Sequence, residues 1–142
     1  KKNYFGKYSK IEIGKANCIK EGSEIAILSN GAIGKNVTLA IAKIGNKKTI
    51  AHYDFAFIKP LDEKMLHSIF KKFESIITIE DGVIKGGFGS AIVEFALQNN
   101  SKASIKTLGI PDEFIEHGTV EELQKHCCID IQSLAVLFEE LS

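Results

Sequence analysis

The sequence contains no arginine and no tryptophan, and only two prolines and three cysteines occur among its 142 residues. All 18 basic side chains are therefore lysines. Because the planar guanidinium of arginine binds phosphate through two parallel hydrogen bonds, its absence counts against a dedicated phosphate clamp in this chain. The cysteines are odd in number and show no C-x-x-C spacing, which argues against a disulfide framework and suits a reducing compartment.

Long apolar runs and an excess of charge of one sign are also missing. No run approaches the roughly 18 apolar residues of a membrane span, and the first residues lack the apolar core of a signal peptide. The 18 lysines balance 18 acidic residues, so no bulk attraction to nucleic acid or to an anionic membrane is expected. We therefore predict a soluble, cytoplasmic protein that binds neither nucleic acid nor membranes.

What the sequence does contain is the composition of one globular domain. The hydrophobic fraction is 44% and the charged fraction is 25%, which is typical of a domain whose core needs no disulfide or metal to support it. Residues 1–9 resemble a linker or a cut end. We therefore expect a single domain over residues 10–142.

Apolar patterning predicts strands that alternate with helices. Short apolar or β-branched runs predict strands at 24–29, 49–58, 75–80 and 104–109. Apolar residues at helical spacing follow each run. The residues expected to cap the helices are Asn30, Asp62, Thr119 with Glu122, and Asp130, and Asp81-Gly82 is expected to turn the chain.

This order of elements predicts the fold class. Strands that alternate with helices form parallel β-α-β units, in which helices cover both faces of the sheet. Segment 10–20, an expected strand or hairpin, lies outside this rhythm and is expected to run antiparallel at an edge. We predict an α/β fold, namely a three-layer α/β/α sandwich.

Glycines mark one of three expected strand ends where a site could form, since ligands of open α/β sheets bind at the carboxyl ends of the strands. These ends are 30–34, 59–62 and 80–90. Gly86, Gly87 and Gly89 could let an anion or another backbone approach the start of a helix. Ile92 breaks the dinucleotide-binding fingerprint, and no P-loop lysine is present. Two roles of these glycines therefore stay open: tight packing or a subunit contact, and direct contact with a ligand.

Charged residues near these ends are further candidates. Glu80 and Asp81 are adjacent, so their side chains point to opposite faces of a strand and favour helix capping or solvation over paired acid–base chemistry. Lys59 before a proline is either an anion contact or an ordinary surface lysine. His117 either serves a site or orders the loop before a capped helix.

The other histidines and the adjacent cysteines suggest no metal chemistry. His126-Cys127-Cys128 has the composition of a metal site, but neighbouring ligands suit one tetrahedral ion poorly and no second pair follows. His52 and His67 are interpreted as structural or surface residues. We therefore expect no metal ion and no catalytic residue in this chain.

Seven strings, in order from about residue 10 to the end, resemble one family. They are KIEIGK (10–15), EG (21–22), IAILSNG (25–31), YDFAFIKPLD (53–62), IITIEDG (76–82), GGFGS (86–90) and LGIPDEFIEHGT (108–119). Together they resemble the C-terminal domain of 1-deoxy-D-xylulose-5-phosphate synthase, a branch of the transketolase superfamily. The glycine string also occurs in 2-oxo-acid dehydrogenase β subunits, so another member of the superfamily, or a free-standing interaction module of the same fold, stays an alternative.

The resemblance implies a mixed five-stranded sheet whose first strand is antiparallel. It also implies a homodimeric parent enzyme that joins pyruvate to glyceraldehyde 3-phosphate with loss of carbon dioxide. In that family two other domains hold thiamine diphosphate and Mg²⁺, so this fragment alone should bind no cofactor and catalyse nothing. Its implied roles are dimer assembly and a part of the substrate-site rim, where Lys59 and His117 are the candidate binding residues.

One position departs from the family pattern. The resemblance implies an arginine, associated with the substrate phosphate, two residues after Asp54, and Ala56 stands there. A methyl group cannot bind phosphate. Either Lys59 or another domain compensates, or the protein uses a different acceptor.

We expect a role in structure or at an interface for Glu80, Asp81, Gly86, Gly87 and Gly89.

Overall fold

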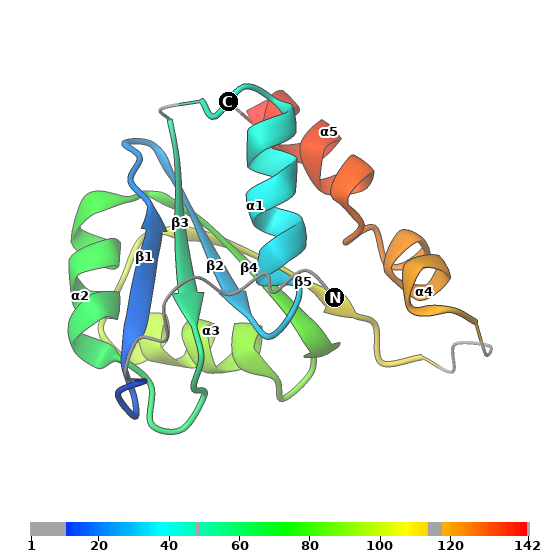
Figure 1. The fold of residues 1–142 in the computed structure, drawn as a ribbon. Coiled ribbons are helices and arrows are strands. Elements are labelled where there is room, and N and C mark those ends of the chain that lie inside the picture. Colours follow the sequence, from blue (N-terminus) through cyan, green and yellow to red (C-terminus); the bar gives the residue numbers. More distant parts are fainter. Residues whose placement is uncertain (1–10, 48, 114–117, 142) are drawn as a thin grey trace.

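The computed structural model describes residues 11–47, 49–113 and 118–141 (Figure 1). The expected linker at 1–9 lies outside the described residues. The elements, in chain order, are β1 (Ala16–Lys20), β2 (Ile25–Asn30), α1 (Gly34–Lys43), β3 (Ile50–Phe55), α2 (Glu63–Lys72), β4 (Ser75–Val83), α3 (Phe88–Gln98), β5 (Ser104–Ile110), α4 (Val120–His126) and α5 (Ile131–Leu141).

The strands form one five-stranded mixed sheet in the order β1-β3-β2-β4-β5. β1 runs antiparallel to β3 at one edge, and the other neighbours are parallel. Helices α1 and α5 lie on one face, while α2 and α3 lie on the other (Figure 1). The predicted α/β class and the antiparallel first strand are confirmed.

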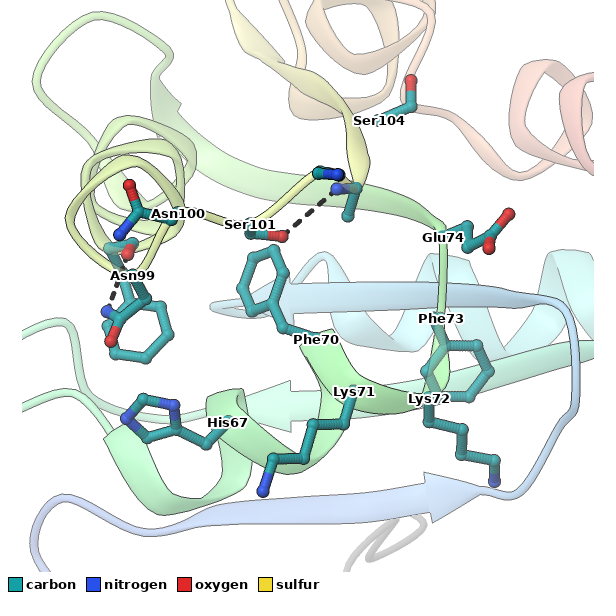
Figure 2. Close-up of a pocket in the computed structure, with 13 residues that line it drawn as sticks. His67, Phe70, Lys71, Lys72, Phe73, Glu74, Asn99, Asn100, Ser101 and Ser104 are labelled. Atoms are coloured by element: carbon teal, nitrogen blue, oxygen red, sulfur yellow. Dashed lines mark hydrogen bonds between the residues drawn. The ribbon is translucent and has the colours of Figure 1, made fainter.

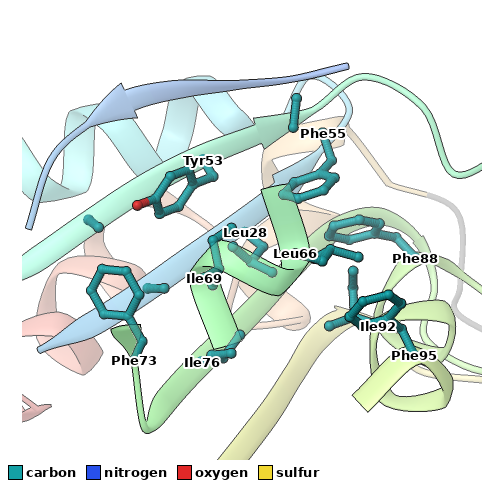
Figure 3. Packing of buried hydrophobic residues seen from close by; sticks show 13 residues of the cluster. Leu28, Tyr53, Phe55, Leu66, Ile69, Phe73, Ile76, Phe88, Ile92 and Phe95 are labelled. Carbon is teal, nitrogen blue, oxygen red and sulfur yellow. The ribbon is translucent and has the colours of Figure 1, made fainter. Parts of the chain in front are cut away.

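The sheet is buried on both faces, which explains the continuous apolar runs of its central strands. In β2, Ala26 and Leu28 belong to the cluster packed under α2 and α3 (Figure 3). Ile25 and Ile27 belong to the cluster under α1 and α5. Because successive side chains of a strand point to opposite faces, one short run supplies both cores.

Asp62 shows how a cap can position two elements. Its Oδ1 accepts a hydrogen bond from the Met65 backbone N–H at 3.0 Å, as expected for the N-cap of α2. Its Oδ2 accepts from the Ala16 N–H at 3.0 Å. The carboxylate therefore joins the start of the edge strand β1 to the start of α2. The expected capping box of Thr119 and Glu122 is also present.

Two local expectations are wrong. Asn30 does not cap α1, which begins at Gly34; its Nδ2 donates to the Phe55 carbonyl at 2.7 Å, because Asn30 still belongs to β2 and faces the neighbouring strand. Asp81-Gly82 does not turn the chain, because β4 continues to Val83, which pairs with Ile110.

Candidate functional site

The carboxyl ends of β2, β3 and β4 lie together at one end of the sheet, where site residues of open α/β sheets gather (Figure 1). Glu80 ends the regular pairing of β4 with β2, opposite Asn30. Ala56 and Lys59 follow β3. His117 lies outside the described residues.

Glu80 is 2% exposed and is used entirely by the start of α3. Its Oε2 accepts the Phe88 N–H at 2.8 Å and its Oε1 accepts the Gly89 N–H at 3.0 Å. A carboxylate at a helix N-terminus satisfies free donors and interacts favourably with the helix dipole. The N–H groups that an anionic ligand would need are therefore already occupied.

The glycines around Glu80 allow this close approach. A Cβ added at Gly87 would lie 2.2 Å from Glu80 Oε2 and 2.4 Å from the Val83 carbonyl oxygen. One added at Gly89 would lie 2.7 Å from Thr78 Oγ1. Gly86 has open space around it, but its φ is +74°, which L side chains rarely adopt. Gly87 and Gly89 thus let α3 pack closely onto the sheet, whereas Gly86 supplies a left-handed backbone.

Asp81 performs the same task on the opposite face of the sheet. Its Oδ2 accepts the Ile33 N–H at 2.8 Å at the start of α1. A Cβ at Gly31 would lie 2.7 Å from the same oxygen. Because neighbours on a strand point to opposite faces, two consecutive acids cap two helices in different layers.

A polar cluster on the α1 face was not anticipated from the sequence. Ser29 Oγ lies 2.8 Å from His52 Nε2 and 3.4 Å from Asp54 Oδ1, and Thr38 Oγ1 lies 3.4 Å from His52 Nδ1. Because Ser29 Oγ donates its single hydrogen to Asp54 Oδ1, it accepts the Nε2–H of His52, while Thr38 Oγ1 donates to the Gly34 carbonyl. Alternation along β3 places His52 and Asp54 on one face, which is the pattern that could have revealed the cluster.

This cluster is not a hydrolytic triad. Ser29 is 0% exposed, so no substrate carbonyl can reach its hydroxyl. Asp54 bonds to the serine, whereas a triad needs the carboxylate to orient the histidine ring. Burial lowers the pKa of His52 to about 4 and raises the pKa of Asp54. The arrangement is a partly buried hydrogen-bond network that ties β2, β3 and α1 together.

The depressed pKa of His52 predicts acid sensitivity. The unfolded chain takes up a proton near pH 6.5, whereas folded His52 resists protonation until about pH 4. Stability from this residue is therefore full above the unfolded pKa and is lost as pH falls below it. Between pH 6.5 and about pH 5, this residue should lower the free energy of unfolding by about 1–2 kcal/mol.

Urea unfolding of the chain and of His52→Gln across this range measures the effect. His67→Gln, at an exposed histidine, is the matched control. His52→Gln should flatten the pH dependence, while the control should keep it. An unchanged slope in His52→Gln would show that other groups cause the acid sensitivity.

Ala56 is exposed and lines a polar pocket of about 440 Å³ together with Lys15, Asn17 and Asp54. Lys59 is exposed, and no residue in the described ranges forms an ion pair with it. The structure therefore brings Lys15, rather than Lys59, into the pocket that Ala56 lines. The sequence offered no indication of this, because Lys15 is 41 positions away in the chain.

The residues that the structure describes at these strand ends do not form a site for thiamine diphosphate or Mg²⁺. The donors at the starts of α1 and α3 are occupied by Asp81 and Glu80, so no free helix N-terminus is left there for a diphosphate. Within the described ranges no group of three or more His, Cys, Asp or Glu side chains could hold a metal ion. None of the described helices has both the length and the apolar character that a membrane crossing requires.

Comparisons with known proteins show which family the chain belongs to. The sequence model of the family described as transketolase, C-terminal domain, matches residues 14–134. A 1-deoxy-D-xylulose-5-phosphate synthase of Cytophaga hutchinsonii is 47% identical over 141 residues, which cover 99% of this chain and 22% of that protein. One of Phocaeicola vulgatus is 49% identical over 126 residues, covering 87% and 20%. The chain thus spans about a fifth of the length of these curated relatives.

Solved structures show the same fold at lower sequence identity. A split-gene transketolase, described as an inactive beta4 tetramer, superposes with a TM-score of 0.82 at 20% identity and covers 97% of this chain and 44% of that one. Transketolase from Campylobacter jejuni gives 0.63 at 13% identity, covering 89% and 18%. The chain therefore belongs to the transketolase C-terminal domain family and is homologous to the C-terminal domain of 1-deoxy-D-xylulose-5-phosphate synthases.

Proposed function

We propose that the chain is the non-catalytic C-terminal domain of a thiamine-diphosphate-dependent 1-deoxy-D-xylulose-5-phosphate synthase of the cytoplasm. The parent would join pyruvate to glyceraldehyde 3-phosphate with loss of carbon dioxide, in isoprenoid precursor synthesis. The observation that carries this proposal is the 47–49% identity along 87–99% of the chain to synthases of which it covers only about a fifth.

A structural role within a larger enzyme is supported by how the acids and glycines are used. Glu80 and Asp81 hold the starts of α3 and α1, so both carboxylates have a structural use. Ile11 and Ile13 expose 73% and 76% of their surface, which offers apolar area for other domains or a second copy to cover. We assign thiamine diphosphate and Mg²⁺ to the other domains, and dimer assembly to this one.

The rim of the substrate site is the finer part of the proposal. Ala56 lies at the carboxyl end of the sheet, where an acceptor phosphate would approach. Lys59 follows it three positions later, and Lys15 lines the same pocket. His117 stays a candidate by sequence. If the usual geometry applies, Ala56 is a deficit in phosphate binding, and the lysines compensate as point charges without a bidentate grip.

Ala56→Arg in the full-length parent tests this role. A guanidinium at this position should lower the KM for glyceraldehyde 3-phosphate about tenfold, which corresponds to ~1.4 kcal/mol of added binding. The KM for pyruvate should barely change. Steady-state kinetics with glyceraldehyde 3-phosphate and with unphosphorylated glyceraldehyde measure the difference, since only the first has a phosphate.

Ser68→Arg is the matched control, because it adds the same side chain at an exposed position of α2. That variant should leave both KM values unchanged. If Ala56→Arg alters both aldehydes equally or neither, position 56 does not face the acceptor phosphate, and the proposed role at the rim is wrong.

A further inference from the structure

An open groove lies at the opposite end of the sheet from Ala56 and Glu80. It has a volume of about 850 Å³ and is bounded by the last turns of α2 and α3 and by the starts of β4 and β5 (Figure 2). His67, Phe70 and Lys71 line one side, and the segment 99–104 lines the other. Its volume is in the range of small-molecule sites, about 300–1,000 Å³.

Three rings form an aromatic surface in this groove. The His67 and Phe95 rings lie 5.0 Å apart between centroids at an interplanar angle of 66°, and the Phe70 and Phe95 rings lie 5.8 Å apart at 34°. Phe95 is buried, while Phe70 is half-buried and His67 is exposed. Phe70 and His67 are therefore supported from below by Phe95 and present aromatic surface to the groove. Such surfaces stack planar ligands.

The groove also carries a local excess of positive charge, although the chain as a whole is neutral. Lys71, Lys72 and Lys102 line it against the single acid Glu74. Lys72 is already engaged, because its Nζ lies 3.3 Å from Glu21 and 5.0 Å from the centre of the Phe73 ring. No ion pair joins Lys71 or Lys102 to another residue in the described ranges. Lys71 and Lys102 are therefore available to bind an anionic group.

The far wall is held rigidly by its own hydrogen bonds. Asn99 Nδ2 donates to the Phe95 carbonyl at 2.8 Å, the Ser101 N–H donates to the Ala96 carbonyl at 2.9 Å, and the Ala103 N–H donates to Ser101 Oγ at 3.2 Å. Asn100 adopts a left-handed backbone with φ +52° and its side chain is exposed beside the groove (Figure 2). The wall is therefore preorganised, with an amide able to both donate and accept hydrogen bonds.

We propose that this groove binds a small planar aromatic ligand that carries a phosphate or carboxylate group. The ring stacks on Phe70 and His67, the anionic group meets Lys71 and Lys102, and Asn100 hydrogen-bonds to the ring edge. The groove lies at the amino ends of β4 and β5, away from the carboxyl ends of the strands, where the substrate rim is proposed. A ligand bound in this groove would affect the domain itself and would take no part in the reaction of the proposed parent enzyme.

Adenosine monophosphate is the probe, and backbone amide NMR of the isotope-labelled 142-residue chain is the measurement. The probe should shift resonances of Phe70, Phe95, Asn99 and Asn100 and bind with a Kd at or below about 1 mM. Adenosine and inorganic phosphate, each alone, should bind at least about fivefold more weakly, because each makes only part of the contacts.

The double variant Lys71→Gln/Lys102→Gln should weaken binding about tenfold or more. Its matched control is Lys64→Gln/Lys106→Gln, which removes two exposed lysines that do not line the groove and should leave binding unchanged. The proposal is overturned if the probe shifts no groove resonance at millimolar concentration. It is also overturned if inorganic phosphate binds as tightly as the nucleotide, or if both double variants bind equally well.

Discussion

Gly87→Ala should lower the free energy of unfolding by about 3 kcal/mol, although it adds only one methyl group. The added Cβ would lie 2.2 Å from Glu80 Oε2 and 2.4 Å from the Val83 carbonyl oxygen. Neither atom can retreat easily, because Val83 O is backbone and the Glu80 carboxylate is held by two N–H groups. Overpacking of this kind costs about 1–3 kcal/mol, and loss of the buried cap adds to it. Urea unfolding measures the change.

Gly86→Ala is the matched control for this substitution. Position 86 has open space around it and a φ of +74°, so the same methyl group should cost only the strain of a left-handed backbone, about 1 kcal/mol. Gly87 has an ordinary φ of −89°. An equal loss in both variants would mean that backbone conformation, rather than the close approach to Glu80, explains the glycines.

Glu80→Gln should also destabilise the fold by about 3 kcal/mol, despite the similar shape of the side chain. Two carboxylate oxygens accept the Phe88 and Gly89 N–H groups, whereas an amide has one oxygen and would point an NH₂ at a donor. The variant also removes the negative charge from the N-terminus of α3. A buried donor left without an acceptor costs about 1–3 kcal/mol.

Asp81→Asn shows whether the destabilisation expected for Glu80→Gln comes from the buried geometry of Glu80 or from the lost charge. Asp81 is exposed and accepts one N–H group, that of Ile33, which an amide oxygen can still accept. Asp81→Asn should therefore lower the free energy of unfolding by at most about 1 kcal/mol. If Asp81→Asn costs as much as Glu80→Gln in denaturant unfolding, the removed charge is the cause and the buried geometry of Glu80 is not.

Much of the fold could be predicted because strong local patterns agree with the final packing. The apolar runs that became β2 and β4 and the caps Asp62 and Thr119 depend on residues close in sequence, so they are visible in the chain itself. The antiparallel edge strand β1 could be expected because its segment precedes the β-α-β rhythm. Asn30 was misassigned for the opposite reason, since its partner, the Phe55 carbonyl, is 25 residues away.

The candidate site was harder to predict, because its contacts join distant segments. Alternation along β4 shows that Glu80 and Asp81 face opposite ways, but not that α3 and α1 begin at those carboxylates. His52 was interpreted as a structural or surface residue, and only the parallel register of β2 and β3 shows that it meets Ser29. That register depends on the whole sheet and cannot be derived from one strand.

Formation of 1-deoxy-D-xylulose 5-phosphate from pyruvate and glyceraldehyde 3-phosphate tests the proposed function most directly. Two proteins are compared in the presence of thiamine diphosphate and Mg²⁺: the full-length parent that contains this sequence, and the 142-residue chain alone. Because the helix N-termini that could hold a diphosphate are occupied by Glu80 and Asp81, the chain alone should form no product, while the parent should form it. Product from the chain alone, or none from the parent, would contradict a non-catalytic domain of such a synthase.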